Sequence, residues 1–264
     1  MVHLQSRPRK KETMRYHAKL TALIGLLAAS ACADPTPLAL RGGVAVSFST
    51  RAPAPPPAPI GFAPRAMLDD TIVQGTDTLI ITRARIVLRE VELKRLETPD
   101  CTGDSIVGCE EVEFGPVLVD LPLDVGAQQQ FDIEIPTGTY SRIDFEIHKV
   151  GDSDPADLAF RQAHPEFADI SMRVEGTFNS QAFVFISDLN VEQELDLVPA
   201  LVVDSTTNTN VTVFVDLDTW FRTVTGTLVD PATANKGGLN EGLVQENIKQ
   251  SLEAFEDPDR DGSD

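Results

Sequence analysis

Apolar and charged residues alternate with a period of two along most of the chain after Thr78. The clearest run extends from Arg142 to His148, where isoleucine and phenylalanine occupy every second position. Three similar runs lie at residues 131–135, 170–175 and 211–217. A period of two places alternate side chains on opposite faces, so each run predicts a strand with one packed and one solvated face. The chain is therefore predicted to be mainly β, an antiparallel β-sandwich; a closed barrel is the alternative.

Irregular segments interrupt this pattern. The run from Leu79 to Leu96 is too long for one strand, and the phase of its apolar positions slips, which indicates bulges or a turn. Pro136–Gly138 fits a type I turn, and the polar segment Asp204–Asn210 resembles the loop of a hairpin. These signals separate the predicted strands from one another.

Two helices are predicted beside the strands. Asp154 is a suitable N-cap and Pro155 suits the first helical position, so a short inserted helix begins here. Near the C-terminus, apolar residues recur at intervals of four, four and three from Val244 to Phe255. This spacing gives one apolar stripe, which predicts an amphipathic helix over about residues 241–255 that packs against the sandwich.

The first 31 residues have the features of a bacterial lipoprotein signal peptide. Basic residues precede the apolar run Leu20–Ala31, which is too short to span about 30 Å of hydrocarbon as a helix. Small residues then lead to Cys32, the expected site of lipidation and the first residue of the mature protein. Two alternatives remain open: ordinary secretion with Cys32 as a free thiol, and a retained anchor helix. Both Met1 and Met14 are suitable starts.

Composition divides the rest of the chain into three parts. Residues 32–77 contain the lipid anchor and a proline-rich stretch that is expected to form an extended tether. Within this part, Val44–Ser49 alternates like a possible first strand. Residues 78–255 are predicted to form the sandwich with its C-terminal helix, and residues 256–264 an acidic tail.

The chain is strongly acidic, with a net charge of −19. Removal of residues 1–31 takes away six Lys and Arg side chains and one Glu, which leaves a net charge of −24. Such a surface repels nucleic-acid phosphates and anionic lipid head groups, so both are disfavoured as partners. Solubility, a saline habitat or binding of divalent cations would each explain the acidity.

Cys101 and Cys109 are the two cysteines that lipidation leaves over. The seven residues between them include two glycines, which allow the ends of the loop to meet. Exported proteins meet an oxidising compartment, so a disulfide is predicted. A redox-active pair is less expected without C-x-x-C spacing, and a zinc site would need further ligands nearby.

Asp257, Asp259 and Asp261 alternate before Gly262, which matches the first half of an EF-hand loop. Alternate carboxylates can converge on calcium, the one cofactor that the sequence suggests. The printed residues stop before the twelfth loop position, where a bidentate glutamate is expected. A disordered acidic tail is the alternative.

Little in the sequence indicates catalysis. It contains no G-x-S-x-G, H-E-x-x-H, P-loop or G-x-G-x-x-G motif. Glu192 and Glu194 could serve a secreted carboxylate-dependent hydrolase, although solvated strand faces explain such pairs more simply. Four aromatic residues could form the sugar-stacking platform of a calcium-dependent carbohydrate-binding module, or fill the core: Phe183, Phe185, Trp220 and Phe221.

The expected function is that of a non-catalytic binding or structural module of the cell envelope. A lipid anchor would hold it on a membrane, at the periplasmic face or the cell surface. The expected partner is a cell-envelope protein or polysaccharide, and no catalytic residue is assigned.

Residues 78–220 resemble a known family through four features that occur together. These are Leu88–Leu93, the cysteine loop, Val119–Leu123, and Pro136–Tyr140 followed by an alternating strand. In this combination the segment is similar to a domain-of-unknown-function family of exported bacterial lipoproteins. The resemblance implies a transthyretin- or immunoglobulin-like β-sandwich, and it implies no activity and no site residues.

Overall fold

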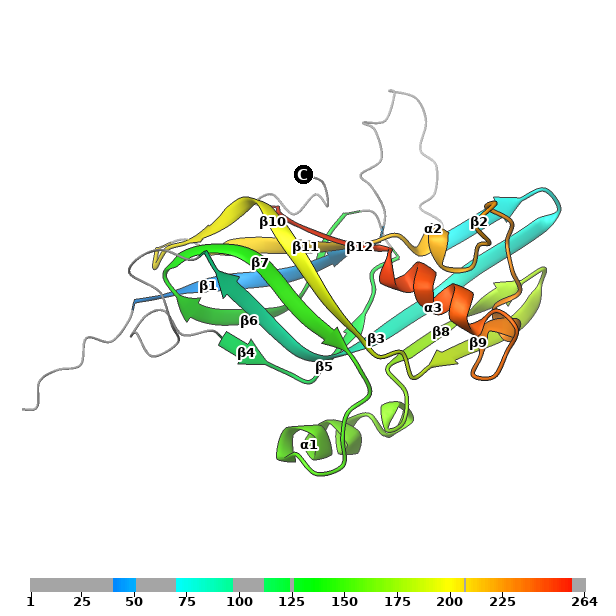
Figure 1. Ribbon diagram of the computed structural model, residues 1–264, viewed down its shortest axis with the longest axis horizontal. Helices are drawn as coiled ribbons and strands as arrows, with labels where there is room; N and C mark the ends of the chain where they lie inside the picture. The colour runs from blue at the N-terminus through cyan, green and yellow to red at the C-terminus, as the bar shows by residue number, and fades with distance from the viewer. Residues whose placement is uncertain (1–39, 51–69, 97–111, 124–125, 207, 258–264) are drawn as a thin grey trace, which may run out of the picture. The chain divides into compact units, whose positions relative to one another are not determined.

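The structure, a computed structural model, describes residues 40–50, 70–96, 112–123, 126–206 and 208–257. All of them belong to one compact unit, Pro37–Asp264. They form two packed sheets of four and eight strands, mostly antiparallel, with a few short helices (Figure 1). The predicted mainly β fold with two sheets is confirmed.

The four-stranded sheet has the order β12-β11-β1-β6. Its strands are β1 (Arg41–Ser49), β6 (Gln128–Pro136), β11 (Thr209–Val215) and β12 (Leu252–Glu256). β1 and β11 run parallel, and the other pairs in this sheet are antiparallel. Both faces of β1 and β11 are largely buried, as is usual for parallel strands. The strand expected at residues 44–49 is confirmed as β1.

The eight-stranded sheet is organised around one long strand, β3 (Asp77–Arg95). The register of its partners places β7 and β8 one after the other along one side, and β2, β5 and β4 along the opposite side. β10 then pairs with β7, and β9 with β8. The bounds of these strands are Asp70–Gln74 (β2), Val112–Phe114 (β4), Val117–Asp120 (β5), Gly138–Ile147 (β7), Met172–Phe178 (β8), Gln181–Ser187 (β9) and Val191–Val203 (β10).

The change of partner from β8 to β7 along one side of β3 explains the irregular spacing of its apolar residues. The structure contains one continuous strand of 19 residues where the sequence suggested that the run was too long for one strand. Its register shifts at three points, beginning at Ile81, Leu88 and Lys94, so the predicted bulges are confirmed. The shift at Leu88 falls where the partner changes from β8 to β7, so one strand pairs with β8 along its first part and with β7 along its second.

The sheets begin earlier in the chain than the sequence analysis placed them. β1 and β2 both precede Thr78, in the segment assigned to the anchor and tether. β1 supplies Val44, Val46 and Phe48 to the main core, so this strand is part of the folded unit. The proline-rich stretch lies outside the described residues.

Both predicted turns join strands of different sheets. Pro136–Gly138 connects β6 to β7, and the Tyr140 hydroxyl donates to the Pro136 carbonyl at 2.7 Å across this corner. Asp204–Asn210 leads from β10 to β11, which do not pair, so the hairpin expected there is wrong. The polar sequence signals a change of direction but does not determine which strand the chain joins next.

The inserted helix is confirmed as α1 (Pro155–Ala163). The Asp154 side chain accepts a hydrogen bond from the Ala156 amide at 2.8 Å, as an N-cap should. A 3₁₀ turn, η1 (Pro165–Phe167), follows directly. The other short helices are α2 (Leu217–Trp220), η2 (Pro231–Ala234) and α3 (Glu241–Lys249). Among the described residues no helix is long and apolar enough to cross a bilayer.

The C-terminal helix is shorter than predicted. α3 ends at Lys249, and both Leu252 and Phe255 belong to β12. The Ser251 hydroxyl donates to the Ile248 carbonyl at 2.8 Å where the helix ends, and β12 then pairs with β11. A buried Leu252 suits a strand as well as a helix, so the apolar spacing could not separate the two.

Candidate functional site

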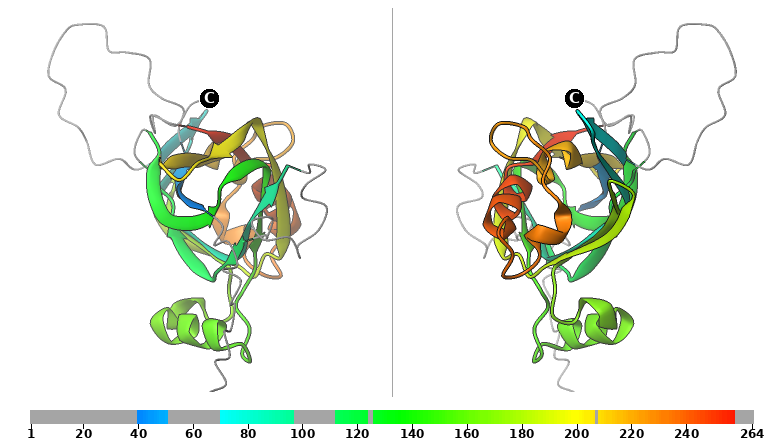
Figure 2. Two further views of the ribbon diagram at one scale, coloured as in Figure 1. Left: turned by 90° about the vertical axis from the view of Figure 1, so that its left-hand side faces the viewer. Right: turned by 90° about the vertical axis from the view of Figure 1, so that its right-hand side faces the viewer.

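The charged side chains of the candidate site lie on the outer face of the eight-stranded sheet, opposite the apolar residues that β3 and β7 contribute to the main core. At the centre of the sheet, β7 ends and β8 begins, and the chain between them forms α1 and η1, which stand on this face (Figures 1 and 2). A small second core lies beneath this insertion, formed by Val87, Val150, Phe160 and Phe167. The insertion is therefore packed onto the sheet through its own apolar contacts.

Two arginines on either side of Val87 add polar contacts to this packing. The Arg85 guanidinium lies 4.9 Å from the centre of the Phe167 ring and 3.1 Å from the Glu166 carboxylate. Arg89 contacts Glu146 at 3.3 Å and, more loosely, Asp157 of α1 at 3.7 Å. The long strand β3 thus holds η1 at one arginine and α1 at the other.

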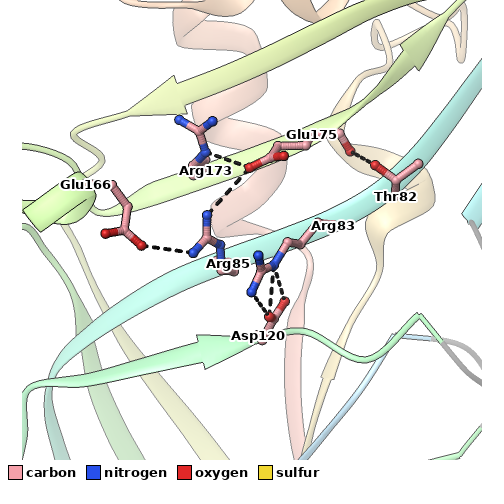
Figure 3. Close-up of polar contacts among 7 residues, drawn as sticks. All are labelled: Thr82, Arg83, Arg85, Asp120, Glu166, Arg173 and Glu175. Carbon is pink, nitrogen blue, oxygen red and sulfur yellow. Dashed lines mark hydrogen bonds and ion pairs between the residues drawn. The ribbon is translucent and has the colours of Figure 1, made fainter. Parts of the chain in front are cut away.

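Figure 3 shows the first of these clusters. Arg85 lies between Glu166 and Glu175, and the distance to Glu175 is 3.5 Å. Its side chain is only 10% exposed, and its Nε has no hydrogen-bond partner in the described part of the chain. Arg173 contacts the same Glu175 at 2.7 Å, and this hydrogen bond lowers the pKa of Glu175. The cluster is internally neutralised, so it fixes structure and leaves little charge for a ligand.

The arrangement is different where β3, β7 and β10 lie side by side. Strand register places outward side chains in three rows that run across the three strands. The rows, each written in the order β10, β7, β3, are Glu192–Glu146–Glu90, Glu194–Asp144–Glu92 and Asp196–Arg142–Lys94. We call the first two the acidic rows. Directly opposed like charges destabilise a sheet, so both rows store electrostatic repulsion.

A shallow cavity of about 220 Å³ opens over the acidic rows. Five of its six lining residues are acidic: Glu90, Glu92, Asp144, Glu146 and Glu192. The cations of this face lie beside it rather than within it. Lys94 contacts Glu92 at 2.6 Å, Arg142 contacts Asp144 at 2.7 Å, and Arg89 contacts Glu146 at 3.3 Å.

Acidic side chains outnumber basic ones in this part of the described sheet. The three rows hold seven carboxylates and two cations, and Arg89 adds a third cation. Arg142 also binds Glu194 at 2.9 Å, so one guanidinium serves two carboxylates. Within these three rows the carboxylates therefore outnumber the cations.

Glu192 and Glu194, the pair considered for catalysis, lie on this face. Both side chains are exposed, and each is opposite another acid on β7. Sequence reasoning did not include the other acids in a site, namely Glu90, Glu92, Asp144 and Glu146. Their alternation along β3 and β7 was visible, but their alignment depends on a strand register that no local pattern specifies.

Asp257, the first of the three proposed calcium ligands, is fully buried after β12. Its carboxylate accepts a hydrogen bond from the Thr212 hydroxyl at 2.9 Å, and its backbone carbonyl accepts one from the side-chain amide of Asn210. These contacts give Asp257 a structural role in the four-stranded sheet. The other two ligands, Asp259 and Asp261, lie outside the described residues. No group of His, Cys, Asp or Glu within the described ranges is arranged to hold a metal ion.

The remaining site residues of the sequence analysis, Cys32, Cys101 and Cys109, also lie outside the described residues. The lipid anchor and the disulfide therefore stay predictions.

The four aromatic residues fill the core, as the favoured of the two interpretations predicts, and do not form a sugar-stacking platform. Trp220, Phe221, Phe183 and Phe185 all belong to the main core. Phe221 packs edge-on against Phe185, with ring centres 5.4 Å apart, and the Trp220 indole donates to the Ser251 hydroxyl at 2.8 Å. Rings held in this way have no free face on which a sugar could stack.

Comparisons with known proteins identify no relative of this chain. No family model, curated protein or solved structure matches this chain. The chain is a mainly β protein with two packed sheets, and no family is identified.

Proposed function

We propose that this protein is a non-catalytic binding module of the bacterial cell envelope, and that its acidic rows bind a positively charged partner. The single observation that carries the proposal is the alignment of six carboxylates in two rows across β10, β7 and β3. Opposed carboxylates cost stability in the free protein. A cationic partner relieves this repulsion, so the binding face is complementary to positive charge before the partner arrives.

A basic segment of an envelope protein fits this geometry best. Successive rows are two residues apart along each strand, which corresponds to about 6.8 Å. Basic side chains at alternate positions of an extended peptide have the same spacing. A single chelated ion fits less well, because the described residues offer no group with metal-binding geometry.

The hydrolase alternative finds less support. Glu192 and Glu194 are exposed on an outward sheet face, whereas a hydrolase needs acids that converge on an enclosed substrate. The cavity over the acidic rows is also small, about 220 Å³, compared with ordinary ligand pockets of roughly 300–1,000 Å³.

We place this module outside the cytoplasm, attached through a lipid on Cys32. The basic and apolar start of the chain and the small residues before Cys32 support this part of the proposal. Cys32→Ser is expected to move the protein from the membrane fraction to the soluble fraction; retention in membranes would contradict lipid anchoring. The resemblance to exported lipoproteins with a transthyretin- or immunoglobulin-like sandwich agrees with this location. A Cys101–Cys109 disulfide would be seen as a loss of two hydrogens in the non-reduced peptide mass.

Calorimetric titration tests the binding function directly. The probe is a short peptide with lysine at every second position, added to the purified full chain. The variant Glu192→Gln/Glu146→Gln/Glu90→Gln removes one acidic row and should weaken binding about tenfold or more, since each 1.4 kcal/mol is tenfold. A matched variant, Asp152→Asn/Asp169→Asn/Glu246→Gln, removes the same charge elsewhere and should bind like the wild type. Equal weakening in both variants would show that only net charge matters.

A further inference from the structure

A second cavity lies at the other helical region of the molecule, between the chain that follows α2 and the helix α3. Its volume is about 310 Å³, within the range of small-ligand pockets. Seven residues line it, and none is acidic: Thr219, Arg222, Thr223, Val224, Gly226, Asn247 and Gln250. The chain has 41 acidic and 22 basic residues, so the lining of this cavity, with one guanidinium and no carboxylate, is opposite in charge to the chain as a whole.

The walls of this cavity are firmly held. Residues 222–228 form a small hairpin, in which Arg222 bridges to Leu228 and the Thr223 amide donates to the Thr227 carbonyl at 2.8 Å. Asn247 of α3 reaches across the cavity wall. Its side-chain amide lies within 3.0 Å of the carbonyls of Thr219, Trp220 and Arg222, which ties the hairpin to the helix.

Arg222 is oriented by its own backbone contacts. Its Nε donates to the Asp218 carbonyl at 2.7 Å and its Nη1 donates to the Gly226 carbonyl at 2.9 Å. A guanidinium has five N–H donors, so three remain without a partner among the described residues. Within the same residues Arg222 forms no ion pair, although it exerts an electrostatic effect on nearby Asp216. The positive charge is thus fixed in place and only distantly compensated.

We propose that this cavity binds a small ligand through an oxyanion, a carboxylate or a phosphate, with Arg222 as the charged partner. The planar fork of a guanidinium matches both kinds of oxyanion. Gln250 lies in the same lining. Its side-chain amide donates one hydrogen to Glu246 at 2.8 Å, which leaves a second N–H for the ligand. This site is independent of the acidic rows, which would repel such a ligand.

Nuclear magnetic resonance titration of the purified full chain provides the test. Inorganic phosphate and acetate are added in separate titrations at constant ionic strength, with chloride as the reference. Saturable shifts are expected at the amides of Thr223, Gly226 and Gln250. Saturation with phosphate alone assigns a phosphate ligand, and saturation with acetate assigns a carboxylate. The absence of saturable shifts with both anions at millimolar concentration would overturn the proposal.

Three variants distinguish anion binding in this cavity from non-specific attraction of anions to positive charge. Arg222→Gln should abolish the saturable shifts. Because this change also removes contacts within the hairpin, Gln250→Glu provides a second variant that leaves those contacts intact. It places a carboxylate in the cavity and should raise the dissociation constant about tenfold, the effect of roughly 1.4 kcal/mol of repulsion. Lys249→Gln removes one charge from the same helix outside the lining and should change little. Equal weakening by Gln250→Glu and Lys249→Gln would contradict a defined site.

Discussion

Glu192 on β10 lies directly opposite Glu146 on β7. Strand neighbours of like charge are disfavoured, and here Glu90 on β3 extends the same row on the far side of Glu146. Folding alone would favour a neutral or cationic residue at one of these positions. Our proposal is that a bound cationic partner offsets the repulsion between these neighbouring carboxylates.

Removing one charge from this row should stabilise the free protein. Glu192→Gln keeps the shape of the side chain and removes its repulsion with Glu146, which should raise the free energy of unfolding by roughly 0.2–1 kcal/mol. Urea denaturation at neutral pH and low salt measures the change. The matched control is Asp152→Asn, which removes an exposed carboxylate outside the sheets and should leave the stability nearly unchanged. A destabilised Glu192→Gln protein would mean that the acidic row stabilises the fold.

Arg85 should matter far more than its neighbour Arg83. Arg85 is 10% exposed and lies between Glu166 and Phe167. Arg83 is 48% exposed, and its one ion pair within the described residues is with Asp120. Arg85→Met is expected to cost roughly 1–3 kcal/mol, since hydrogen bonds to charged groups contribute about that much. Arg83→Met should cost less than about 1 kcal/mol, as exposed ion pairs do.

Hydrogen exchange locates the effect of the Arg85 change. Amides of α1 and η1 should exchange faster in Arg85→Met than in wild type, because the guanidinium holds the insertion on the sheet. Unchanged exchange there, together with a general loss of stability, would argue that Arg85 supports the sheet and not the insertion.

Asp216 should give the protein a component of stability that falls as pH rises. Burial raises the pKa of Asp216, and its hydrogen bond from the Asp218 amide offsets this only in part. The folded state therefore binds this proton more tightly than the unfolded state. Stability from this group is present below the ordinary aspartate pKa and is lost as pH rises through the raised value.

Asp216→Asn isolates that component, because asparagine can still accept the capping hydrogen bond of α2. Relative to wild type, the variant should gain stability between acidic and neutral pH. Thermal unfolding of both proteins across this window measures the difference. Other acids, such as Glu175 and Asp188, have lowered pKa values and give the opposite trend, which cancels in the comparison. A constant difference at all pH values would contradict the raised pKa.

Asn235 should protect the edge of the eight-stranded sheet. Its side chain accepts from the Ile186 amide at 2.9 Å and donates to the Val184 carbonyl at 3.3 Å, as a neighbouring strand would. Unprotected edges invite pairing with other chains. Asn235→Ala should therefore increase self-association of the protein, measured by sedimentation at rising concentration, while Asn235→Asp should have a smaller effect because it retains the acceptor. A monomeric Asn235→Ala protein would show that the edge is protected by other means.

Local patterns predicted those elements that depend on local physics. Alternation located β6, β7 and β11, and the capping residues Asp154 and Pro155 located α1. Leu252 was assigned to a helix because a buried apolar residue fits both periods, and only pairing with Val215 places it on a strand. β2 was not predicted, because this strand has only five residues and pairs over its whole length with β3.

The candidate site was less predictable because it depends on residues that are distant from one another in the sequence. Glu90, Glu146 and Glu192 are far apart in the sequence, and a shift of one residue in any strand would place them on the other face. Arg222 was missed because its cavity depends on contacts between the hairpin and Asn247. A short sequence motif can reveal a site only when the residues of that site lie close together along the chain, which is not the case here.

The proposed binding face can be mapped residue by residue. The lysine-alternating peptide is titrated into the isotope-labelled full chain, and the amides that shift are mapped by magnetic resonance. We expect saturable shifts on β10, β7 and β3 around the two acidic rows, weakened by added salt because partly exposed charges are screened. Shifts spread evenly over the acidic residues of the chain, or centred on another element, would contradict it.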